Sequence, residues 1–181
     1  AYVVGNKQIG LFSKDKDGWY QYDSTLAIND VATSIVISPS GLDVYVGSSQ
    51  LNTIYAYKRS PATGQLTLQN QYPNVAGVKS LTLTPDGRHL FATAPTVNRI
   101  AAYHRDPVSG QLTLIRTIAG QNAPYFGAAS PDNRHLYFPD WGDDGRTLVV
   151  TRDIGQPTPF NVSVTPGIML ENTNLGIKHT Q

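Results

Sequence analysis

The chain has 181 residues, and its charged fraction of 15% is low against a usual value of roughly a quarter. Its 14 basic and 13 acidic residues almost balance and form no basic run, so we expect no binding of nucleic acid or anionic lipid. Cysteine is absent, which excludes disulfides and thiolate sites, and no apolar run approaches the roughly 20 residues that a membrane-spanning helix needs.

Short β-prone runs fill the first 26 residues. They predict three strands, over residues 2–5, 8–13 and 19–26, with a turn between the second and the third. The turn contains Asp15 and Asp17 but lacks the ligand series and closing Glu of a calcium loop. We therefore interpret it as a plain strand connection.

The next strands become more polar along the chain. Residues 33–38, TSIVIS, are nearly all β-branched or apolar, which is typical of a strand buried on both faces. Strands at residues 43–47 and 53–58 follow, and residues 65–69 alternate between polar and apolar as expected at an outer edge. These four strands predict one unit of about 46 residues.

The unit recurs along the chain. QLTL at residues 65–68 returns 46 positions later at residues 111–114, and Tyr45, Phe91 and Tyr137 have the same spacing. The later strands are expected over residues 79–84, 89–93, 99–104, 111–117, 125–130, 135–138 and 146–151. Apolar residues nowhere recur at helical spacing, so the sequence predicts an all-β fold.

The pattern frays after Arg152. Residues 160–165 could be a shortened outer strand or the inner strand of a following unit. We therefore assign residues 1–166 to the repeats and residues 167–181 to a C-terminal strand or tail.

Four-stranded units of this length are typical of a β-propeller, in which each unit is one blade and the inner strands surround a central channel. The segments SPSGLDVYVG, TPDGRHLFAT and SPDNRHLYFP, with SPATGQLTL and DPVSGQLTL after the next strand, resemble the repeats of lactonase-type or YVTN-type propellers. The resemblance covers roughly residues 2–152, and its motifs are blade scaffolding without a catalytic group. It implies relatives such as lactone hydrolases, a muconate cycloisomerase, quinoprotein amine dehydrogenase subunits and surface or periplasmic proteins. A periplasmic or extracellular location is expected from it.

Such propellers usually have seven blades, whereas this sequence predicts about four, a partial or small propeller. The chain could be a piece of a larger protein, could pair with a second chain to complete a ring, or could close a small ring with its C-terminal strand. We favour the first arrangement. Open blade edges could also support self-association.

No standard catalytic motif is present: the sequence has no phosphate loop, no two-His zinc motif and no nucleophile elbow. The histidines are expected on different blades or in the tail, so we predict no metal site and no cofactor.

Two stretches depart from the repeat and are candidate ligand sites. Thr33, Lys79 and Tyr125 begin successive inner strands, at the mouth of the expected channel, and the last two differ although their surroundings repeat. Asp140 and Trp141 lie in PDWGDDG, which could bind a cation or a sugar. The simpler interpretation of PDWGDDG is a longer hairpin loop with Trp141 packed on a neighbouring blade.

Without a convergent acid, base or nucleophile, the sequence favours a non-catalytic module that binds a small molecule or a protein. The alternative is a lactonase-like hydrolase or isomerase that acts at the channel mouth. A third, weaker option is the propeller subunit of a redox enzyme whose partner carries the cofactor.

Overall fold

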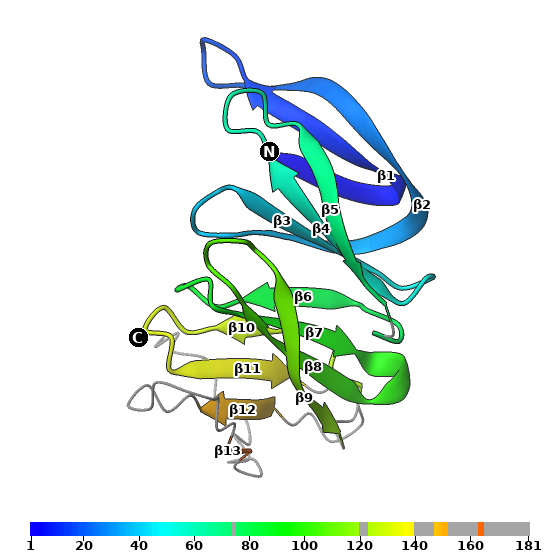
Figure 1. Ribbon diagram of the computed structural model, residues 1–181, viewed down its shortest axis with the longest axis vertical. Helices are drawn as coiled ribbons and strands as arrows, with labels where there is room; N and C mark the ends of the chain where they lie inside the picture. The colour runs from blue at the N-terminus through cyan, green and yellow to red at the C-terminus, as the bar shows by residue number, and fades with distance from the viewer. Residues whose placement is uncertain (74, 120–122, 140–146, 152–162, 165–181) are drawn as a thin grey trace, which may run out of the picture.

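The chain forms three antiparallel sheets, which follow one another in chain order from the top to the bottom of Figure 1. The computed structural model describes residues 1–73, 75–119, 123–139, 147–151 and 163–164. In these residues the regular structure is β-strand apart from one short 3-10 turn, η1 (Pro95–Val97), which confirms the predicted all-β class. Within this described part, no helix has the length and apolar character needed to cross a membrane.

The first sheet has the strand order β1-β2-β3-β4-β5. Its strands are β1 (Tyr2–Lys14), β2 (Tyr20–Ile37), β3 (Asp43–Ser48), β4 (Thr53–Arg59) and β5 (Leu66–Tyr72). The beginning of β2 pairs with β1 and its end pairs with β3. Strands predicted separately at residues 19–26 and 33–38 are thus one continuous element, which passes from one blade into the next.

Element β1 folds back on itself. The amide of Phe12 donates to the carbonyl of Ala1 at 2.9 Å, although 11 extended residues would span about 36 Å. Lys7, with a left-handed φ of 60°, lies at the reversal. β1 therefore contains the two short strands predicted at residues 2–5 and 8–13.

The second sheet has β6 (Ser80–Leu83), β7 (His89–Ala94), β8 (Arg99–Arg105) and β9 (Leu112–Ala119). The third sheet has β10 (Ala128–Ala129), β11 (His135–Pro139), β12 (Thr147–Thr151) and β13 (Ser163–Val164). Because β13 pairs with β12, the described part of residues 160–165 forms an outer strand. The tail at residues 167–181 lies outside the described residues.

These sheets give four successive blades. The first is incomplete and consists of β1 with the beginning of β2. The second consists of the end of β2 with β3, β4 and β5. The third consists of β6 to β9, and the fourth of β10 to β13.

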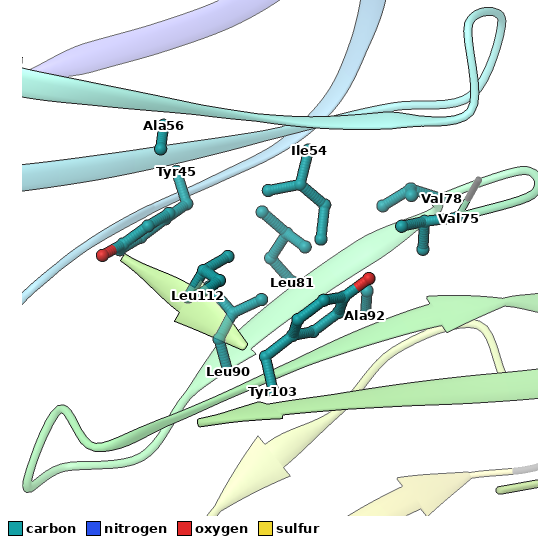
Figure 2. Packing of buried hydrophobic residues seen from close by; sticks show 10 residues of the cluster. All are labelled: Tyr45, Ile54, Ala56, Val75, Val78, Leu81, Leu90, Ala92, Tyr103 and Leu112. Carbon is teal, nitrogen blue, oxygen red and sulfur yellow. The ribbon is translucent and has the colours of Figure 1, made fainter. Parts of the chain in front are cut away.

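Alternation along each strand joins neighbouring blades. In β3, Val44 and Val46 pack against the first blade, whereas Tyr45 between them packs against the third. Figure 2 shows Tyr45 and Ile54 of the second blade facing Leu90 of the third. Strands β3 and β4 therefore each contribute side chains to two interfaces, which agrees with their near-continuous apolar runs.

Three equivalent turn glycines test this packing. Gly18, Gly64 and Gly110 all have positive φ, of 86°, 74° and 76°, so alanine at each position is strained. An added Cβ would meet no atom within 4 Å at Gly18, Leu11 at 3.3 Å from Gly64, and the Asp43 carboxylate at 2.5 Å from Gly110.

We expect alanine at Gly18 to lower the free energy of unfolding by about 1 kcal/mol, and alanine at Gly110 to lower it by at least twice as much. Urea unfolding of the three alanine variants measures this order. Equal losses at Gly18 and Gly110 would contradict the close approach of the third blade to the second.

Candidate functional site

Two predicted site residues meet where the inner strands begin. The Lys79 Nζ atom lies 5.3 Å from the centroid of the Tyr125 ring, and both side chains are half-buried. A lysine ammonium over an aromatic face is a favourable cation–π contact. The structure thus brings Lys79 of the third blade and Tyr125 of the fourth into one site.

Thr93, which the sequence did not indicate, is hydrogen-bonded to the backbone of both residues. Its hydroxyl donates to the carbonyl of Tyr125 at 3.0 Å, and its own carbonyl accepts the amide of Lys79 at 2.9 Å. Thr93 is fully buried. The equivalent position of the second blade is Gly47, so the repeat gives no signal for this role.

Thr33 lies at the matching place one blade earlier. Its hydroxyl donates to the carbonyl of Val78 at 2.7 Å, and the carbonyl of Gly47 is 3.1 Å away. The hydroxyl therefore joins the second and third blades. For the predicted role in ligand binding, Thr33 would have to exchange these bonds.

Asp140 and Trp141, the other candidates, lie outside the described residues. They directly follow Pro139, the last residue of β11. Their proposed role in cation or sugar binding stays a prediction.

A buried carboxylate is found at the beginning of the second blade. Asp30 is fully buried, and it accepts hydrogen bonds from the amide of Val31 at 2.7 Å and from the Tyr55 hydroxyl at 3.0 Å. Burial, together with this hydrogen bond to Asp30, raises the pKa of Tyr55 to about 12. Because Asp30 is not exposed, we interpret it as a structural group.

A second buried network joins the second and third blades. It lies at the strand ends opposite to those near Thr33 and Lys79, where β3 begins and β8 ends. The guanidinium of Arg105 donates to the Tyr45 hydroxyl at 2.8 Å, to the Gly87 carbonyl at 3.0 Å and to the Asp43 carboxylate. Tyr45 in turn donates to the carbonyl of Gly110 at 2.6 Å. Tyr45 and Asp43 lie about 60 residues before Arg105, so the sequence shows no local motif for this network.

The histidines differ from expectation in one respect. His89 and His104 pair across β7 and β8, with ring centroids 5.7 Å apart, so they do not lie on different blades. The ladder register places them opposite each other. Within the described ranges, no three His, Asp or Glu side chains gather in a way that could hold a metal ion.

A separate cleft of about 470 Å³ lies between the first and second blades. Lys14, Asp23 and Arg59 provide its charges, and Tyr2 and Tyr20 its aromatic surface. Leu26 lines a second pocket of about 270 Å³ between the same two blades, and the second blade has Tyr72 at the repeat position of Leu26.

Buried tyrosines predict a loss of stability at alkaline pH. Burial raises the pKa of Tyr45 and of Tyr103 to about 12, well above the ordinary value of 10. Because the folded pKa values are raised, the stabilisation is complete below about pH 10 and is lost as the pH rises toward 12.

A titration of tyrosinate absorbance should therefore show a late group of phenols that ionise together with unfolding. The variant Tyr103→Phe should lose less stability between pH 10 and 12 than the unaltered chain. Titration of every tyrosine near pH 10 in the folded chain would contradict the prediction.

Four-stranded antiparallel blades at a 46-residue repeat, with inner strands that begin around one site, define this protein as a β-propeller. The family model described as lactonase, 7-bladed beta-propeller matches residues 20–126. The chain belongs to this family, which confirms the resemblance read from its motifs.

Solved structures agree on the fold. A protein from Lactobacillus plantarum has a TM-score of 0.75 and 18% identity, with 86% of this chain and 48% of that chain covered. A candidate 6-phosphogluconolactonase from Bacteroides uniformis has a TM-score of 0.75 and 17% identity, with 89% and 52% covered. The periplasmic gluconolactonase of Pseudomonas aeruginosa has a TM-score of 0.70 and 17% identity, with 85% and 47% covered.

The chain therefore spans about half the length of these structures. Among curated proteins, no sequence matches it.

Proposed function

We propose that the chain provides part of a lactonase-type hydrolase that opens the lactone of a sugar acid. The observation that carries this proposal is the contact between Lys79 and Tyr125 where two inner strands begin, in a chain of the lactonase family. Family membership and neighbours described as gluconolactonases support the hydrolase over the non-catalytic module that the sequence favours.

The two side chains suit a lactone chemically. Attack of water on the carbonyl carbon places negative charge on the carbonyl oxygen, and the Lys79 ammonium could stabilise that charge. The ring of Tyr125 offers an apolar face for a sugar ring and orients the ammonium above it. The ring carbon–oxygen bond then breaks, and a carboxylic acid and a hydroxyl are formed.

The test is proton release from glucono-lactone, measured against the spontaneous rate in the same buffer. We expect Lys79→Gln to lower the catalysed rate by about a hundredfold to a thousandfold, as loss of one oxyanion donor does. Tyr125→Phe keeps the aromatic face and should retain more activity than Tyr125→Leu.

Lys16→Gln is the matched control because Lys16 is an exposed turn lysine. Equal rates for the Lys79 and Lys16 variants would place the site elsewhere. If the chain gives no rate above the spontaneous reaction, the hydrolase proposal is wrong and the non-catalytic binding module is favoured instead.

A further inference from the structure

The pocket of about 270 Å³ between the first and second blades has apolar walls and a polar rim. Its apolar lining comes from both blades and consists of Ile9, Leu11, Leu26 and Leu66. Ser24 and Gln65 are exposed and provide polar groups at the rim. Ligand pockets combine apolar walls with a few polar groups that fix the orientation of the ligand.

The next pair of blades shows how the chain itself fills the equivalent place. Tyr72 lies 46 positions after Leu26, and the strand ladder places each of them opposite an isoleucine. The Tyr72 hydroxyl accepts a hydrogen bond from the amide of Leu112 at 2.8 Å. A phenol group of the second blade thus reaches the third blade and is fixed there by one backbone donor.

The equivalent backbone donor of the second blade is the amide of Leu66, 46 positions before Leu112. The amide of Ser60 donates to the carbonyl of Gln65 at 2.9 Å, so the next pair of the ladder, which contains Leu66, is a non-hydrogen-bonded pair. The amide of Leu66 therefore points away from β4. Because Leu26 has no hydroxyl, the first blade offers this amide no counterpart of the Tyr72 oxygen.

We propose that this pocket binds a small phenol with a single ring. The ring would lie between Leu26 and Leu66, and its oxygen would accept the Leu66 amide as the Tyr72 hydroxyl accepts the amide of Leu112. Leu66 is half-buried, whereas Leu112 is 7% exposed, so a bound ring would cover apolar surface that the chain leaves open.

The size of the pocket suits a ligand of this class. Its volume of about 270 Å³ lies just below the range of about 300–1,000 Å³ that is typical of pockets for drug-sized ligands. The pocket belongs to the first and second blades, whereas Lys79 and Tyr125 belong to the third and fourth. The proposal therefore does not depend on the proposed hydrolase.

An NMR titration of the ¹⁵N-labelled chain with 4-methylphenol tests the proposal, because this probe is the side chain of tyrosine as a free molecule. We expect saturable shifts with a dissociation constant of roughly 1–10 mM, largest at the amide of Leu66 and extending to Leu26. Toluene has the same ring without the hydroxyl. It should bind about tenfold more weakly, since it cannot accept the hydrogen bond.

The variant Leu26→Tyr supplies a phenol from the chain itself and should abolish binding of 4-methylphenol. Leu114→Tyr is the matched control, because Leu114 also lies on an outer strand and is 54% exposed; it should leave binding unchanged. The titration of the unaltered chain decides the proposal even if Leu26→Tyr fails to fold.

Four results would overturn the proposal. They are equal affinity for 4-methylphenol and toluene, shifts centred away from Leu66, no saturable shifts at all, and undiminished binding by folded Leu26→Tyr.

Discussion

Asp43→Asn is expected to lower the free energy of unfolding by about 3–5 kcal/mol, because it leaves a buried guanidinium without its carboxylate. The Arg105 side chain is only 3% exposed and is bonded to Asp43, which also accepts the Lys58 ammonium at 2.8 Å. In a low-dielectric interior, an unpaired charge costs more than the pair contributed. Urea unfolding measures the loss.

Asp23→Asn is the matched control, because Asp23 is exposed and accepts a hydrogen bond from the Ser13 hydroxyl at 2.8 Å. It should cost less than about 1 kcal/mol. The double variant Asp43→Asn, Arg105→Met should recover part of the lost stability, since no buried charge remains. Equal losses in the Asp43 and Asp23 variants would contradict the prediction.

Phe91→Ala is expected to cost about 3–5 kcal/mol through the cavity it opens between the third and fourth blades. Phe91 is fully buried and its ring centroid lies 5.9 Å from that of Phe138, which is 1% exposed. Phe91 stands where the second blade has Tyr45. The interface between the third and fourth blades therefore depends on apolar packing at this position. The interface between the second and third blades instead has the hydrogen bonds of Tyr45 with Arg105 and Gly110.

Thermal or urea unfolding of Phe91→Ala is compared with Phe126→Ala, a residue that is 53% exposed. The control should cost well under half as much. A small effect at Phe91 would mean that the third and fourth blades do not share this core.

The blades themselves could be predicted from the sequence because their cause is local. Alternating apolar residues specify strands, and turn residues such as Gly64 and Gly110 recur at the spacing of one blade. The two short strands within β1 were predicted from this local pattern, but the continuity of β2 was not. A strand that leaves one blade and enters the next has no turn residue to mark the boundary.

The contact of Lys79 with Tyr125 was also within reach of the sequence, because equivalent positions of adjacent blades lie side by side. The partnership of Arg105 with Asp43 was not, since nothing in the spacing of single charged residues shows which pairs face each other. The repeat does contain a signal in retrospect. Tyr2 and Arg59 reproduce the pair Tyr45 and Arg105 one blade earlier.

The proposed function differs from the first expectation for a related reason. Absence of a standard motif favoured a non-catalytic module, but lactonase-type chemistry needs only a few polar groups placed by separate blades. Such groups, like Lys79, belong to no sequence motif. Their role can be inferred only from the side chains that lie next to them in the fold, such as Tyr125.

The most direct test of the proposed site is an NMR titration of the ¹⁵N-labelled 181-residue chain with gluconate, the stable product of glucono-lactone opening. We expect the shifted amides to cluster around Lys79 and Tyr125, and we expect Lys79→Gln to remove the shifts while Lys16→Gln does not. Shifts confined to the cleft around Lys14 and Arg59, or no saturable shifts at all, would contradict it.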